Sequence, residues 1–136
     1  MKAMVLMLVV GSGVLAAATP VLAHHSFVAE FDQSKPVTLR GTLTKMEWVN
    51  PHGCIYVDVK GPDGKTENWA VEAGSAGALL KRGLRQTDFQ IGVEVVVEGY
   101  LARNGRAIAN GKSVKFADGR NFFLGSSLPD AETGGK

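Results

Sequence analysis

The residues of this chain best suited to chemistry are its three histidines, His24, His25 and His52. His24 and His25 directly follow residues 21–23 (Val-Leu-Ala), a run of compact residues typical of a signal-peptidase site. Cleavage after Ala23 would make His24 the first residue of the mature chain. The α-amine, a group whose pKa is about 8, and the ring Nδ1 of His24 would then be able to chelate one metal ion.

A third nitrogen would have to come from a distant imidazole, and His52 is the remaining histidine. Three nitrogens of this kind form a planar set that suits Cu(II), with Zn(II) as the second choice. The arm of residues 24–36 spans up to about 40 Å when extended, so its length permits this pairing. We therefore predict a metal site at His24 and His52, with His25 as an auxiliary ligand.

Cys54 is a further candidate ligand, because it lies two residues after His52 and alternate residues of a strand share a face. As the only cysteine it cannot form an intramolecular disulfide, and a free cysteine is commonly a small buried residue. A second interpretation of the histidines stays open. His24 and His25 would lie in a mobile amino terminus, and His52 would only cap the turn after Pro51.

A different kind of site would use aromatic side chains. Trp48, Tyr56 and Trp69, one on each of the first three predicted strands, have the character of a platform for a sugar, a peptide or a small amphiphile. The alternative is that they belong to the core. The platform underlies a competing function, a metal-free interaction module that binds a peptide, an envelope component or a small ligand.

The start of the chain has the parts of a cleavable signal peptide over residues 1–23: Lys2, an apolar run and the compact residues before the cut. A retained anchor is the alternative, but the run is short and contains glycine, so we expect no stable membrane span after cleavage. Loss of 23 of the 136 residues would leave 113, enough for one core. The protein is predicted to be periplasmic or secreted.

Charge and composition argue against some partners. The whole chain has a net charge of +2, so removal of Lys2 would leave +1, which does not favour nucleic acid as a partner. Residues 126–136 have the composition of a flexible tail, with no apolar periodicity.

Residues 37–125 alternate apolar and polar side chains in short segments separated by turns. The first segment changes parity after Leu43, which predicts a β-bulge near Thr44–Lys45. The turn at residues 61–64 predicts a hairpin, and Asn104–Gly105 predicts another. Strands are predicted at residues 37–48, 54–59, 67–72, 93–100 and 107–116, with a short closing strand through Phe122 and Leu124.

The segment of residues 75–83 has a helical pattern, with Ser75 as a candidate N-cap and Gly83 suited to the position after the helix. Three strands, a helix and two strands follow the order of an OB fold, in which closure protects the strand edges. We predict an all-β domain over residues 37–125 with one short helix, a five-stranded OB-like closed barrel. A different small β-barrel or a sandwich is the alternative.

Several segments together resemble a known family. They are "HHSFVAEFD", "KPVTLRGTLTKMEWVNPH", "ENWAVE", "GSAGALLKRG", "VEVVVEGY" and "ANGKSVKFADG". In these the chain is similar to a bacterial family of small exported proteins, domain of unknown function 6152, from His24 to about Gly125. Such proteins often have an aromatic or aliphatic residue after Asn-Pro-His, where this chain has Gly53-Cys54. The resemblance implies fold and export, and it implies no activity.

No recognised catalytic motif is present, because the chain lacks Gly-x-Ser-x-Gly, a phosphate-cradling loop and a metalloprotease helix. Four glutamates alternate with apolar residues as on a solvated sheet face, a pattern that does not indicate a paired-carboxylate hydrolase. They are Glu67, Glu72, Glu94 and Glu98. We therefore expect a small binding protein rather than an enzyme.

Overall fold

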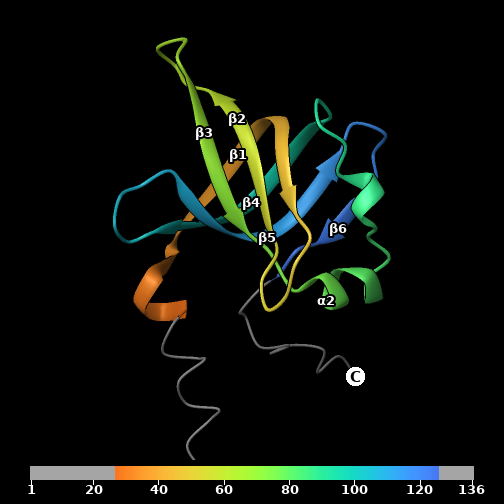
Figure 1. The fold of residues 1–136 in the computed structure, drawn as a ribbon. Helices are drawn as coiled ribbons and strands as arrows, with labels where there is room; N and C mark the ends of the chain where they lie inside the picture. The colour runs from red at the N-terminus through yellow and green to blue at the C-terminus, as the bar shows by residue number, and fades with distance from the viewer. Residues whose placement is uncertain (1–26, 126–136) are drawn as a thin grey trace, which may run out of the picture.

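The computed structural model describes residues 27–125 as a mostly β fold (Figure 1). Its strands are β1 (Phe31–Glu47), β2 (Cys54–Lys60), β3 (Thr66–Glu72), β4 (Glu94–Ala102), β5 (Ile108–Phe116) and β6 (Asn121–Phe123). Helix α2 (Ala76–Lys81) and the 3₁₀ helix η1 (Gln86–Asp88) connect β3 to β4. Residues 27–30 form a further helical turn before β1.

Several predictions concern residues outside this range. The predicted signal peptide of residues 1–23, the histidines His24 and His25, and the predicted tail of residues 126–136 all lie outside the described residues. Among the helices of residues 27–125, none has the length and apolar character that a membrane crossing requires.

The six strands pair in the order β3-β2-β1-β4-β5-β6, and each neighbouring pair is antiparallel. One further pairing joins strands from the two halves of this order: residues 70–72 of β3 run parallel to residues 108–110 of β5. The sixth strand, β6, adds to the edge of β5 at the position of the predicted short closing strand, although it ends at Phe123, before Leu124. The helical content also exceeds the single predicted helix.

Strand β1 is long because its first part pairs with β4 and its last part pairs with β2. Residues 31–42 pair with β4, and residues 41–47 pair with β2. It begins at Phe31, six residues before the predicted start at Val37. The register shift between Leu43 and Lys45 confirms the predicted bulge.

The hairpin predicted at residues 61–64 is confirmed, because β2 and β3 pair along their whole length around it. The predicted N-cap is confirmed as well: the Ser75 side chain accepts a hydrogen bond from the Ala78 amide at 3.1 Å. Gly83, after the helix, has a φ of +89° that suits glycine.

The core lies between the inward faces of β1 to β5, and α2 and the segment after β6 cover one end of it. Its fully buried aliphatic side chains include Leu43, Ile55, Val57, Val71, Leu79, Leu84, Val97, Val114 and Leu124. The strand residues among them are those that the alternation assigns to the inward face.

Gly41 should be intolerant of a side chain, because it pairs with β2 and β4 at once. An added Cβ would overlap the backbone carbonyl oxygen of Asp58. We expect Gly41→Ala to lower the free energy of unfolding by roughly 1–3 kcal/mol, measured by urea denaturation. Gly77→Ala is the control, since no atom lies within 4 Å of its Cβ position, and it should be neutral or stabilising. Equal stability of Gly41→Ala and the native protein would contradict this packing.

A cluster around Arg120 ties η1 to the β5–β6 turn. The Arg120 guanidinium lies 2.8 Å from the Asp88 carboxylate and 2.7 Å from that of Asp118. It also lies over the Phe116 ring, at 5.2 Å from the ring centre. The hydrogen bond from Arg120 holds the pKa of Asp88 below its usual value.

The lowered pKa of Asp88 gives the cluster a defined pH dependence. A carboxylate with a depressed pKa stabilises the fold above its unfolded pKa, about 4, and this stabilisation is lost as the pH falls through the folded value. Asp88→Asn should therefore cost about 1 kcal/mol at pH 7. Thermal unfolding of the two proteins should converge in strong acid, and a difference that persists at pH 2 would show that the charge is not responsible.

Candidate functional site

His52, the one predicted metal-site histidine among the described residues, lies in the loop between β1 and β2. Its side chain is 46% exposed, and its Nδ1 lies 3.6 Å from Oε1 of Glu72. The ring is thus open to solvent on one side and faces a carboxylate on the other. Glu72 is the last residue of β3 and belongs to the half-buried residues.

The loop that carries His52 is held against the end of β3 by backbone hydrogen bonds. Gly53 donates to the carbonyl of Gly74 at 3.0 Å, and Ala73 donates to the carbonyl of Gly53 at 2.8 Å. A Cβ at Gly53 would lie only 3.1 Å from the Gly74 carbonyl oxygen, so a small residue lets the loop approach this closely. These contacts place His52 next to Glu72.

Glu72 is the neighbour of His52, although its alternation with apolar residues predicted a place on a solvated sheet face. In the sheet register Glu47 pairs with Cys54, and Cys54 pairs with Glu72. Residues that pair directly across strands project to the same face, so these side chains share one face with the Cys54 thiol in the middle. The turn signal at residues 61–64 marks the hairpin but does not give this register, because the loop between Lys60 and Thr66 has five residues and is centred on Asp63.

The charges around Glu72 define the electrostatics of the site. Burial raises the pKa of the Glu72 carboxyl, the nearby His52 lowers it, and the negative charge of Glu30 raises it. Glu30 belongs to the helical turn before β1, so the start of the described chain lies within electrostatic reach of Glu72.

The helical turn of residues 27–30 is firmly attached to the sheet. The Phe27 ring is buried and contacts the ring of Tyr100 at a centroid distance of 6.4 Å and that of Phe31 at 5.7 Å. Arg103, in the β4–β5 turn, donates from Nε to the Val28 carbonyl at 2.7 Å, and its backbone amide donates to the Glu30 carbonyl at 2.8 Å.

The sheet register connects the two parts of this region. Glu72 pairs with Asn110 on β5, and Asn110 pairs with Tyr100 on β4. Two strand spacings therefore separate Glu72 from Tyr100, a distance of about 10 Å. Phe27 packs on Tyr100, so the beginning of the described chain lies on the same part of the sheet as Glu72, the partner of His52.

The described residues supply only part of a metal site. Within residues 27–125, no three His, Cys, Asp or Glu side chains are grouped so that they could hold a metal ion. His52 and Glu72 form a pair that can supply one ligand and its supporting carboxylate, since a carboxylate beside one ring nitrogen orients the other for a metal.

The three aromatic residues predicted to form a platform do not share one face. Trp48 packs on Phe89 at a centroid distance of 6.2 Å, and both Trp48 and Trp69 pack against the core. Tyr56 alternates with the buried Ile55 and Val57 and so points outward. There its hydroxyl donates to Glu47 at 3.3 Å, and Lys45 lies 5.1 Å from its ring centre.

The family described as "Family of unknown function (DUF6152)" matches residues 11–111 of this sequence. The chain belongs to the DUF6152 family. The match covers strands β1 to β4 and the beginning of β5, and therefore includes His52, Cys54 and Glu72. Searches of curated proteins and of solved structures found no match. The family description contains no activity, so the chemistry of this DUF6152 member has to follow from its residues.

Cys54 in this DUF6152 member should be an unreactive thiol. Burial raises its pKa, so the thiolate fraction at neutral pH is small. The hydrogen bond with Cys54 in turn contributes most to raising the pKa of Tyr56 to about 12. We expect the thiol to react with Ellman's reagent at pH 7.5 at least tenfold more slowly in the folded protein than in 6 M guanidinium. Equal rates would show that the thiolate is accessible.

Proposed function

We propose that this protein is an exported metal-binding protein of the periplasm or the extracellular space, selective for Cu(II) first and Zn(II) second. After removal of residues 1–23, the α-amine and imidazole of His24 and the imidazole of His52 would bind the ion. His25 is an auxiliary ligand on this proposal. Three nitrogens of this kind suit Cu(II), which prefers a tetragonal arrangement of nitrogen and oxygen ligands.

The observation that carries the proposal is the pairing of His52 with Glu72. The 3.6 Å approach of Oε1 to Nδ1 favours the tautomer with hydrogen on Nδ1 and leaves Nε2 for a metal. Glu72 thereby acts through His52 and not as a ligand itself. Cys54 pairs with Glu72 across the strands. Its raised thiol pKa and half-buried position both argue against Cys54 as a metal ligand.

The buried position of Phe27 supports the proposal that His24 can approach His52 closely enough for both to bind one ion. Only His25 and Ser26 separate His24 from Phe27, so the chain limits the reach of His24 to within about 10 Å of a buried anchor. Glu30, on the same helical turn as Phe27, is close enough to Glu72 to raise its pKa. An anchored amino terminus loses less entropy on chelation than the free 13-residue arm that the sequence suggested.

We also infer that the sheet closes as a five-stranded OB-like barrel with β6 added at its edge. Support comes from the pairings, which lead from β1 through β2, β3, β5 and β4 back to β1. In such barrels the loop between the first two strands is one of those that bind ligands. The position of His52 in the β1–β2 loop agrees with that use.

The decisive variants remove one nitrogen at a time from the mature protein that starts at His24. Acetylation of the α-amine and the substitution His52→Ala should each weaken Cu(II) binding at least tenfold, measured by competition titration against a chelator of known affinity. An acetyl group is preferable to an added residue, because one added residue would place His25 third and create a different copper site. Unchanged affinity after either modification would refute the proposed ligand set.

Two further variants separate ligands from supporting residues. Glu72→Gln keeps the side-chain size and should weaken Cu(II) binding by about 10- to 100-fold through loss of ring orientation. Arg103→Gln removes the guanidinium that holds the Val28 carbonyl, and it should weaken binding several-fold without loss of a ligand. Glu67→Gln, an exposed change on the same strand, is the matched control and should leave the affinity unchanged.

A further inference from the structure

A second candidate site lies on the outer face of the sheet, and its lining includes neither His52 nor Glu72. A hollow of about 680 Å³ extends over β1, β4, β5 and β6. Its charged and polar lining residues are Arg40, Glu94, Glu98, Ser113, Lys115 and Asn121. The volume is within the range of about 300–1,000 Å³ that is usual for small-molecule sites.

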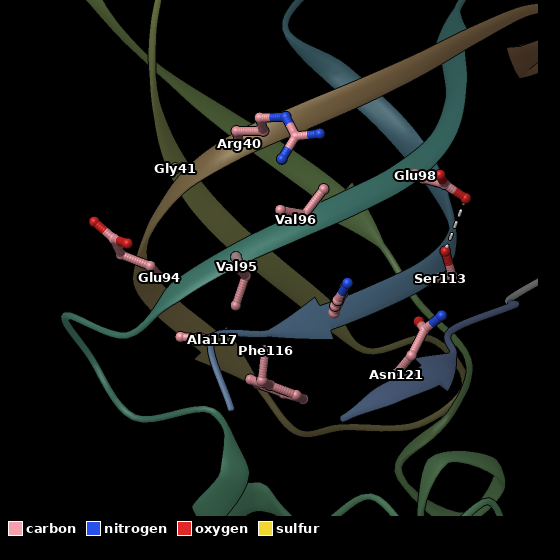
Figure 2. A pocket seen from close by; sticks show the side chains of 11 residues that line it. Arg40, Gly41, Glu94, Val95, Val96, Glu98, Ser113, Phe116, Ala117 and Asn121 are labelled. Carbon is pink, nitrogen blue, oxygen red and sulfur yellow. Dashed lines mark hydrogen bonds between the residues drawn. The ribbon is translucent and has the colours of Figure 1, made fainter. Parts of the chain in front are cut away.

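The centre of this hollow is a row of residues paired across four strands. Arg40 pairs with Val96, Val96 with Lys115, and Lys115 with Asn121. Directly paired residues project to one face, so the short side chain of Val96 forms a floor between two cationic side chains. Figure 2 shows Arg40 and Val96 side by side on neighbouring strands. The hollow forms because the side chain of Val96 is short and those of its cross-strand neighbours, Arg40 and Lys115, are long.

Within residues 27–125, neither Arg40 nor Lys115 takes part in an ion pair. Glu98 accepts a hydrogen bond from the Ser113 hydroxyl at 3.2 Å, as the dashed line in Figure 2 marks, and Glu94 lines the other end. The pattern across the hollow is thus two cations over an apolar floor, with a carboxylate on either side.

We propose that this hollow binds a small aliphatic dicarboxylate. One carboxylate pairs with the Arg40 guanidinium, whose planar donors match it in a bidentate arrangement. The other carboxylate pairs with Lys115 and accepts a hydrogen bond from the amide of Asn121. The methylene chain between them covers Val96 and removes apolar surface from water. Arg40 and Lys115 are separated by two strand spacings, about 10 Å between Cα atoms, so two carboxylates suit them better than one.

The test is an NMR titration of the ¹⁵N-labelled mature protein with adipate, without added metal. Adipate should shift the amide signals of Val96 and Lys115 in a saturable manner, and raising NaCl from 0.05 to 0.5 M should weaken binding several-fold. Adipamide, the neutral diamide of the same length, should bind at least tenfold more weakly. Inorganic phosphate tests for a general anion patch and should also bind at least tenfold more weakly than adipate.

Some variants should weaken adipate binding and one should strengthen it. Arg40→Gln should weaken adipate binding about tenfold, and Lys115→Gln about three- to fivefold. Glu94→Gln removes a repelling charge and should strengthen binding. Lys60→Gln and Arg106→Gln change exposed cations outside the hollow and serve as controls.

Three outcomes would overturn the proposal. These are equal binding of adipate and adipamide, equal binding of adipate and phosphate, and equal losses in the two control variants and in Arg40→Gln. Thermal unfolding of each variant verifies that it is folded. Because none of these residues belongs to the proposed metal site, Cu(II) affinity should be unaffected by Arg40→Gln, and either proposal can fail without the other.

Discussion

The short parallel ladder between β3 and β5 is the interaction on which the rest of this structure depends. It consists of residues 70–72 against residues 108–110. On one side it leads through Glu72 to the hairpin and to the loop of His52. On the other it leads through Asn110 to Tyr100, where Phe27 anchors the start of the described chain. Without it, the β2–β3 hairpin would be attached to the sheet only through β1.

The two proposed sites use this scaffold in physically different ways. The metal proposal draws on the loop of His52, held by the backbone bonds of Gly53, and on the helical turn of residues 27–30, held by the buried Phe27 ring and the Arg103 hydrogen bonds. The dicarboxylate proposal draws on side chains fixed by strand register, which need no rearrangement to present two cations at a set spacing. The first therefore depends on an anchor that can be loosened, and the second depends on the sheet itself.

The local features of the fold were accessible from the sequence because each has a local cause. The bulge after Leu43 follows from a change of parity, the hairpin from a four-residue turn, and the helix start from the Ser75 hydroxyl. The early start of β1 was missed because a register shift between Asp32 and Pro36 interrupts the alternation. Asp32 closes that irregular segment by accepting from the Ser34 amide at 3.0 Å.

The sequence by itself determined the strands apart from the start of β1, together with the helix cap, the turns and the position of His52 in a loop between strands. Only the tertiary structure decided that Glu72 faces His52, that Trp69 faces the core while Tyr56 faces outward, and that Val96 lies between Arg40 and Lys115. The physical reason is that periodicity along a strand fixes which residues share a face, whereas neighbours across strands depend on pairing and register between distant segments.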